Sequence, residues 1–399
     1  MTTKFARLRS TPIAFMMALS FINYLGFSGW SALLYNFTIE RAAFDWSDTG
    51  LTQSVREIPG FLAFTTIFWL AFIREQTLAY AALFILGLGV ALTGQFPTLT
   101  GVLITTFIMS VGFHYFETVN ASLQLQLLPK AEAPRLIGLI AAAGAAASFV
   151  AYGGLAIAWW AGWHAYEQLY LVIGLACAAM VLGARAFFKR FEGPVAQNKS
   201  IVLKRRYWLY YALTFMTGAR RQLFFAFGGF LLVKKFGYSV ADMAVLMLAT
   251  TALNSVLAPR LGALVMKVGE RRTIMLENVV LILVFAGYAT TASWQVAGAL
   301  FVIDGIFFTL TLAQRTYFQK IADSADMAST MSAAFTINHV AAVIVPVAFG
   351  ALGMIDPAII FWLGAGVATV SLSLSFFVPR HPAPGNETVL AAPRPQPAE

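Results

Sequence analysis

Charged residues are scarce in this chain: Asp, Glu, Lys and Arg together make up 11% of its 399 residues, against roughly 25% in soluble domains. Hydrophobic residues make up 59%. A soluble protein of this size needs more polar residues on its surface than this composition supplies. The scarcity therefore excludes a soluble enzyme and a disordered chain, and it predicts an integral membrane protein.

Cysteine is nearly absent, and the motifs of common soluble enzymes are missing. The single cysteine, Cys177, lies in an apolar run and has no partner for an intramolecular disulfide. No phosphate-binding loop, dinucleotide fingerprint, zinc-ligand spacing or nucleophile–histidine arrangement occurs in a polar segment. We therefore expect no enzymatic activity, no cofactor and no resident metal.

The apolar residues form long continuous runs. About 20 apolar residues cross a bilayer as a helix, and only helices or closed barrels satisfy the backbone there. Barrels need short alternating strands, so these runs predict an all-α protein. Breaks at charged residues, Pro and Gly predict twelve transmembrane helices, near 12–37, 49–72, 77–95, 99–127, 134–160, 165–188, 207–233, 240–265, 273–293, 295–319, 327–352 and 357–378.

Basic residues outnumber acidic ones, 27 against 18, and the net charge is +9. Most Lys and Arg fall in alternate loops, on the side that also holds both termini. Such loops face the cytoplasm. The positive charge therefore predicts orientation in the bilayer and no nucleic-acid partner, and we expect a bacterial inner-membrane protein with both termini in the cytoplasm.

The two halves of the chain resemble each other at an offset of 194 residues. Asp48 falls on Asp242, and further matches in spans 4 and 10 place Asn120 on Gln314 and Gln126 on Lys320. A shared offset across several helices predicts a duplicated six-helix bundle. We expect an N-terminal bundle (1–188), a cytoplasmic linker (189–206), a C-terminal bundle (207–378) and a disordered cytoplasmic tail (379–399).

Twelve spans in a 6+6 repeat, cytoplasmic termini and a basic central loop resemble the major facilitator superfamily over about residues 10–380. The family's loop signature consists of glycine, aspartate and basic residues. Its better copy lies between spans 8 and 9, where Met266 stands at the aspartate position and the matching residues are Gly262, Lys267, Gly269, Arg271 and Arg272. The resemblance implies that this is a conformational loop, that spans 1, 4, 7 and 10 line a central cavity, and that spans 3, 6, 9 and 12 face lipid.

Ionisable residues at membrane depth are few, and each costs several kcal/mol unless it faces a cavity or a partner. On span 4, Glu117, Asn120 and Gln124 share one helical face, with His114 at its edge. We assign proton coupling to Glu117, Asp304 and His114, although a membrane histidine is often a plain hydrogen-bond partner. The alternative for such polar stripes is that they only hold helices together.

Two consecutive arginines, Arg220 and Arg221, lie within span 7. Successive helix positions differ by about 100°, so both cannot point into one cavity. The planar guanidinium matches a carboxylate or phosphate. We predict that Arg220 and Arg56, from the opposite bundle, clamp an anion, with Arg221 as the substitute; the alternative is structural salt bridges to Glu57, Glu117 or Asp304. The complete predicted substrate site is Arg56, Arg220, Arg221, Asn23, Tyr24, Asn120, Gln124, Gln222 and Gln314.

These features predict a monomeric secondary active transporter that moves a small organic solute by alternating access. The expected solute is anionic or zwitterionic, and the expected coupling ion is the proton. Two alternatives stay open. One is a proton-driven exporter of lipophilic cations that uses Glu117 and Asp304; the other is a membrane assembly factor or receptor that keeps the same scaffold without transporting.

Overall fold

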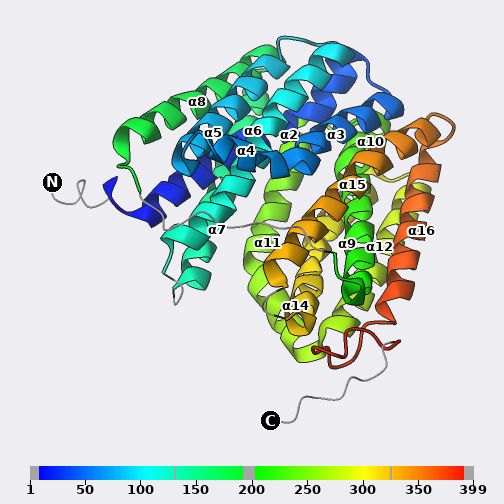
Figure 1. Cartoon of the computed structure of the whole chain (residues 1–399). Coiled ribbons are helices and arrows are strands. Elements are labelled where there is room, and N and C mark those ends of the chain that lie inside the picture. Colours follow the sequence, from blue (N-terminus) through cyan, green and yellow to red (C-terminus); the bar gives the residue numbers. More distant parts are fainter. Residues whose placement is uncertain (1–8, 130–131, 192–202, 324–325, 391–399) are drawn as a thin grey trace. The chain divides into compact units, whose positions relative to one another are not determined.

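The computed structural model describes residues 9–129, 132–191, 203–323 and 326–390. Helices dominate the described part of the chain, and no β-strand occurs there (Figure 1). Ten helical segments within it are long and apolar enough to cross a membrane. They are α2 (Pro12–Ala42), α5 (Glu75–Thr93), α6 (Leu99–Leu127), α7 (Ala133–Trp160), α8 (Tyr166–Phe187), α11 (Val240–Val268), α12 (Glu270–Thr290), the pair α13 (Trp294–Phe307) and α14 (Leu312–Ile321), α15 (Met327–Gly353) and α16 (Pro357–Ser375).

The two remaining predicted spans, the second and the seventh, are helices interrupted by tighter or wider turns. The second consists of α3 (Trp46–Phe61), the 3-10 turn η1 (Leu62–Thr65) and α4 (Thr66–Leu70). Pro59 lies inside α3, and a proline within a helix removes one backbone hydrogen bond and kinks the chain. The seventh consists of α9 (Trp208–Leu223), the π-helical turn η3 (Phe224–Gly228) and α10 (Gly229–Phe236). Twelve predicted spans are consistent with these helices.

Helices of the two halves begin at corresponding positions. Four pairs of starts are separated by 194 or 195 residues: Trp46 and Val240, Glu75 and Glu270, Leu99 and Trp294, Ala133 and Met327. Helix starts that recur at one offset along the chain are expected when one bundle of helices has been duplicated. The helices thus confirm the 6+6 repeat.

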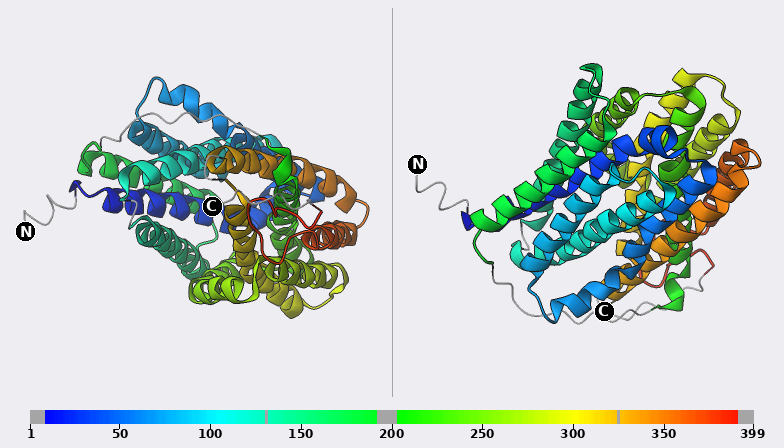
Figure 2. Two further views of the ribbon diagram at one scale, coloured as in Figure 1. Left: turned by 60° about the horizontal axis from the view of Figure 1, so that its bottom comes forward. Right: turned by 90° about the horizontal axis from the view of Figure 1, so that it is seen from above.

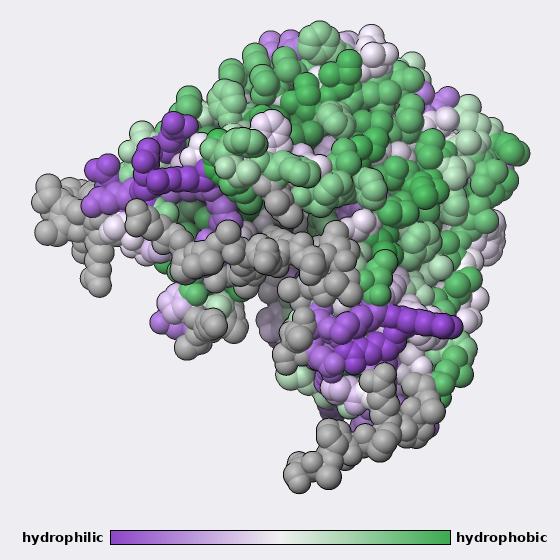
Figure 3. All heavy atoms as spheres, viewed as in Figure 1, coloured by the Kyte–Doolittle hydropathy of each residue, from purple (hydrophilic) through white to green (hydrophobic). Residues whose placement is uncertain are grey.

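Packing divides the chain into two compact units. Unit 1 contains residues 1–44, 55–196 and 237–251, and unit 2 contains residues 45–54, 197–236 and 252–399. Large apolar side chains are exposed on both: Phe68, Ile157 and Leu283, for example, are each about two-thirds exposed. Hydrophobic side chains also cover much of the face in Figure 3. A surface of this kind suits lipid rather than water.

In unit 1, α5 packs closely against both α6 and α8 (Figure 2). The approach depends on glycine: a Cβ added at Gly112 of α6 would lie 2.3 Å from the backbone nitrogen of Leu86 and 2.4 Å from the carbonyl oxygen of Ala82 on α5. Small residues let membrane helices approach to backbone contact, where dispersion forces hold them. Beside this contact lies a buried apolar cluster that includes Leu83 and Phe116.

In unit 2, an ion-pair network joins the start of α9 to the turn before α15. Asp326 accepts from Lys204 (2.5 Å), from Arg206 and from the Tyr207 hydroxyl (2.9 Å), while Arg206 also pairs with Asp323 (2.5 Å). The hydrogen bond from the Lys204 ammonium, helped by the other donors, lowers the pKa of Asp326 to about 2. The Asp326 carboxylate is therefore charged at any ordinary pH.

Replacing Asp326 by asparagine is expected to lower the melting temperature of the purified protein at neutral pH. The native pKa lies below the unfolded value, so the network stabilises fully above about pH 4, and this contribution is lost as the pH falls toward about 2. The difference in melting temperature between wild type and Asp326→Asn should therefore shrink over that interval. Asp323→Asn is the control, because among the described residues the half-exposed Asp323 forms an ion pair only with Arg206. An equal effect of both substitutions would contradict the assignment.

The chain after α16 differs from the expectation of disorder. Residues 379–390 form a turn that returns to unit 2, where the backbone N–H of Val389 donates to the carbonyl of Phe377 (2.9 Å). Gly385 takes a positive φ of 86°, which favours glycine. Composition alone missed this segment because local hydrogen bonds, not a large apolar area, hold it. Residues 391–399, and residues 192–202 of the predicted linker, lie outside the described part.

Candidate substrate and coupling site

In unit 1, α2, α6 and α7 bring together three residues of the predicted site. The amide of Asn23, fully buried on α2, donates to Oε1 of Glu117 on α6 (2.9 Å). The neighbouring Tyr24 is 36% exposed and lies in the electrostatic field of Glu117. Its ring packs over Gly144 of α7, where a Cβ would come within 2.7 Å of the ring. A polar side chain, a carboxyl group and an exposed aromatic ring therefore share this face.

α6 is continuous from Leu99 to Leu127, so its predicted polar face is preserved. Asn120 lies one turn beyond Glu117 and is buried, whereas Gln124 is partly exposed. His114, one turn before, is buried at 7% exposure. A single uninterrupted helix keeps residues three and four apart on one side, so the polar face extends from His114 to Gln124.

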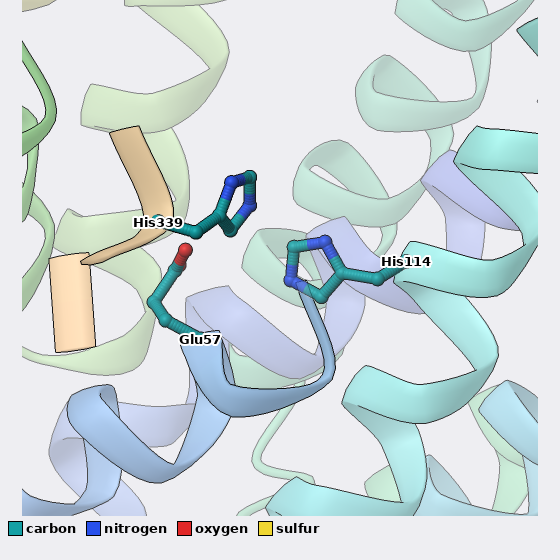
Figure 4. A group of neighbouring side chains, drawn as sticks. All are labelled: Glu57, His114 and His339. Carbon is teal, nitrogen blue, oxygen red and sulfur yellow. The ribbon is translucent and has the colours of Figure 1, made fainter. Parts of the chain in front are cut away.

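A second polar group in unit 1 lies where α3 meets α6. Arg56 and Glu57 form a buried ion pair (2.7 Å), and the Ser110 hydroxyl donates to the carbonyl of Arg56. A Glu57 carboxylate oxygen and a His114 ring nitrogen lie within 4.8 Å of each other, and Figure 4 shows them on α3 and α6. His339, also labelled in Figure 4, belongs to α15 of unit 2, where its Nδ1 lies 2.8 Å from the Phe335 carbonyl oxygen.

In unit 2, Arg220 of α9 pairs with Glu277 of α12. The Nη2 and Oε1 atoms are 2.6 Å apart, and the two side chains are 3% and 0% exposed. The sequence prediction missed Glu277, because the resemblance assigned span 9 to the lipid-facing helices. The signal was present: a charged residue followed by Asn278 interrupts an otherwise apolar run. α12 has two sides: Leu276, Val279 and Leu283 are exposed, as expected of a lipid-facing span, whereas Glu277 lies on the side that is buried in the protein.

Asp304 of α13 joins this pair. It is 4% exposed and lies in the electrostatic field of both Arg220 and Glu277. Three buried atoms of the group have no hydrogen-bond partner in the described part of the chain: Arg220 Nη1, Glu277 Oε2 and Asp304 Oδ2. One guanidinium therefore stands against two carboxyl groups, and a buried charge left without compensation is costly. We call these three residues the buried triad.

The remaining predicted residues of unit 2 lie on α9 and α14. Arg221 is partly buried and Gln222 fully buried, and they follow Arg220 around the helix axis. Gln314, 4% exposed, accepts a hydrogen bond from the Thr217 hydroxyl of α9 (2.9 Å). This contact ties α14 to α9.

The predicted conformational loop spans the end of α11 and the start of α12. Gly262 and Lys267 lie on α11, Gly269 adopts a φ of 86° before α12, and Arg271 and Arg272 follow in its first turn.

Beside the loop, Glu270 pairs with Lys320 of α14 (2.6 Å). In unit 1 the equivalent Glu75 accepts from Gln126 of α6 (2.9 Å). Equivalent helices of the two halves are thus joined in the same way, by a glutamate that accepts from the amide of Gln126 in unit 1 and from the ammonium of Lys320 in unit 2.

Solved structures share this fold. A mutant of the nucleoside transporter NupG matches with a TM-score of 0.76 at 15% identity, over 92% of this chain and 99% of that one. A bacterial homologue of the human lysosomal transporter Spinster matches with a TM-score of 0.73 at 13% identity (92% and 96%). A POT family transporter in complex with 5-aminolevulinic acid matches with a TM-score of 0.71 at 12% identity (92% and 95%). At such identities the likeness shows the fold.

Family membership follows from the sequence itself. No curated protein matches the chain. The family model of the Major Facilitator Superfamily, however, matches residues 14–346, which is most of the chain. The chain therefore belongs to the Major Facilitator Superfamily.

Proposed function

We propose that this protein is a secondary active transporter that moves a small organic anion or zwitterion by alternating access, coupled to protons. The observation that carries the proposal is the buried triad. Arg220 holds Glu277 through Nη2, and its Nη1 has no partner in the described residues. A guanidinium binds carboxylates in a two-pronged geometry, so a solute carboxylate fits the unused side of Arg220.

Charge balance explains the proposed coupling. With both carboxyl groups ionised, the triad carries one net negative charge, and a solute carboxylate adds another. Burying that much uncompensated charge is strongly unfavourable. Solute binding therefore favours protonation of Glu277 or Asp304, and loss of the proton on the other side of the membrane favours solute release. In unit 1, we assign His114 and Glu117 as additional proton acceptors.

The second cation of the proposed clamp is Arg56, with Arg221 as the substitute. Arg56 is held by Glu57, much as Arg220 is held by Glu277. In each case a carboxylate of the protein holds the guanidinium in place, and the proposed solute carboxylate binds Arg220 on the side that Glu277 leaves unused. Solute contacts from uncharged groups are assigned to the face with Asn23, Tyr24, Asn120 and Gln124, and to Gln222 and Gln314.

One observation favours a second function, export of lipophilic cations. Arg56 and Arg220 are both occupied by carboxylates, whereas Glu117 receives the Asn23 amide and forms no ion pair within the described ranges. A carboxylate beside an exposed aromatic ring, here Tyr24, suits an organic cation.

A thermal-shift screen of the purified protein, followed by flux assays in proteoliposomes, tests the proposal. 5-Aminolevulinic acid, the zwitterion bound by the POT family relative, is the first probe, beside simple carboxylates, lipophilic cations and an uncharged nucleoside. We expect carboxylates or zwitterions to raise the melting temperature, more strongly at acidic pH, and to be taken up along an inward proton gradient.

Other outcomes of the screen separate the alternatives. Stabilisation by lipophilic cations, opposed by acidic pH, would support the exporter instead. Binding without flux under any gradient would indicate a receptor or assembly factor and would overturn the transport proposal.

A further inference from the structure

The tenth span is broken, whereas its counterpart in unit 1 is continuous. α13 ends at Phe307, the 3-10 turn η4 covers Phe308–Thr311, and α14 follows from Leu312. In unit 1, α6 runs unbroken over Leu99–Leu127. A 3-10 stretch inside a helix often marks a hinge. The 10 residues of α14 therefore form a segment that η4 separates from α13.

Polar side chains at every third position of α14 connect it to the rest of unit 2. Three of its side chains, three residues apart, each contact a different part of unit 2: Gln314 contacts Thr217 of α9 (2.9 Å), Tyr317 contacts Glu387 after α16 (2.5 Å), and Lys320 contacts Glu270 of α12 (2.6 Å). The Tyr317 hydroxyl donates to the backbone carbonyl of Glu387, and the Tyr317 side chain is fully buried. The position of α14 thus depends on three polar contacts beyond its apolar packing.

The segment that receives Tyr317 is organised by its own hydrogen bonds. The Glu387 carboxylate accepts from the backbone N–H of Gly385 (3.1 Å), and the Asn386 amide donates to the carbonyl of His381 (2.8 Å). Val389 is bonded to Phe377 at the end of α16. Glu387 and Thr388 are consequently buried at 5% and 3% exposure. The turn is thus an ordered segment that contacts α14 through Tyr317.

The position equivalent to Tyr317 in the other half of the repeat carries no hydroxyl group. At the offset of 194 residues, Tyr317 corresponds to Leu123, which is buried in the apolar core of unit 1. The contact of Lys320 with Glu270, in contrast, has its equivalent in Gln126 and Glu75. The Tyr317 contact therefore occurs in the half whose helix is broken, and it is not a feature that the two halves share.

We propose that residues 379–390 form a clasp that holds α14, the part of the span beyond η4, through Tyr317. The clasp is also bonded through Val389 to Phe377, just after α16, so its position does not depend on α14 alone. A single hydrogen bond between a phenol and a backbone carbonyl is weak enough to break and reform during a conformational cycle. The inference concerns the motion of α14 and is independent of the solute.

Hydrogen–deuterium exchange of the full-length protein in lipid nanodiscs tests the clasp. We expect Tyr317→Phe to speed exchange of the α14 amides about threefold to tenfold, the effect of losing one hydrogen bond, and truncation after Pro379 to speed it more. Exchange in α6 should not change. Two controls should match wild type in α14: truncation after Leu390, which keeps the clasp, and Tyr210→Phe, which removes a hydroxyl of α9 from the same core.

Two results would overturn the clasp. One is unchanged α14 exchange in both Tyr317→Phe and the truncated protein. The other is exchange that rises equally in α12, α14 and α16, because the segment would then stabilise unit 2 as a whole. If the truncated protein does not fold, Tyr317→Phe decides alone, since it removes one oxygen atom and keeps the ring.

Discussion

Replacing Arg220 by glutamine is expected to abolish solute uptake, with a loss of at least about 30-fold in apparent affinity. Truncating one partner of a buried, hydrogen-bonded charge pair costs about 2–5 kcal/mol, and each 1.4 kcal/mol is a factor of ten. The side chain is 3% exposed and its ion pair measures 2.6 Å, so solvent screens the interaction little. Uptake and thermal shift with the best ligand of the screen measure both effects.

A double substitution separates transport from folding. Arg220→Gln alone leaves Glu277 buried without its cation, which itself destabilises the protein. Arg220→Gln combined with Glu277→Gln removes both charges, and we expect it to restore the melting temperature without restoring uptake. Arg221→Gln, on the adjacent position, tests the substitute cation: a larger loss of uptake than in Arg220→Gln would assign the clamp to Arg221. If the double variant transported solute like wild type, Arg220 would be structural and the proposed clamp would be wrong.

Replacing Gly112 by alanine is expected to destabilise the protein by about 3 kcal/mol, at the upper end of overpacking effects. The new Cβ would lie 2.3 Å from the Leu86 nitrogen and 2.4 Å from the Ala82 carbonyl oxygen. Both atoms belong to the backbone of α5, so no side chain can rotate away, and α5 and α6 must separate. Thermal unfolding in detergent, together with the yield of monodisperse protein, measures the effect.

Gly183 of α8 supplies the matched control. A Cβ added there meets no atom within 4 Å, and alanine has a higher helix propensity than glycine. We therefore expect Gly183→Ala to leave the melting temperature unchanged or slightly raised. Equal destabilisation by the two substitutions would show that unit 1 does not depend on the contact of α5 with α6.

Sequence alone predicted most of the span positions to within a few residues. The predicted span 99–127 coincides with α6, and the predicted starts at 327 and 357 coincide with those of α15 and α16. Hydropathy and span length are local properties, and the bilayer imposes them on every segment separately. The repeat offset could be found from the sequence for the same reason, because duplicated helices keep polar residues at equivalent positions, such as Asp48 and Asp242.

Pairing between helices could not be read in this way. Glu277 lies 57 residues from Arg220 in the chain, and only the tertiary arrangement, in which α9 and α12 both pack against α16, brings them together. The interruption of span 10 and the clasp over Tyr317 are equally tertiary, because each depends on contacts with other helices. An apolar run gives little indication of which face will be buried, so a single polar residue on it has no visible partner.

The sequence by itself therefore determined that this is a membrane protein of helical spans in two related halves, because composition and periodicity act segment by segment. Only the tertiary structure decided which charges neutralise one another: Arg56 with Glu57, and Arg220 with Glu277 beside Asp304. The physical reason is that a buried charge is stable only with a partner of matching geometry, and the rotation and packing of whole helices set that geometry.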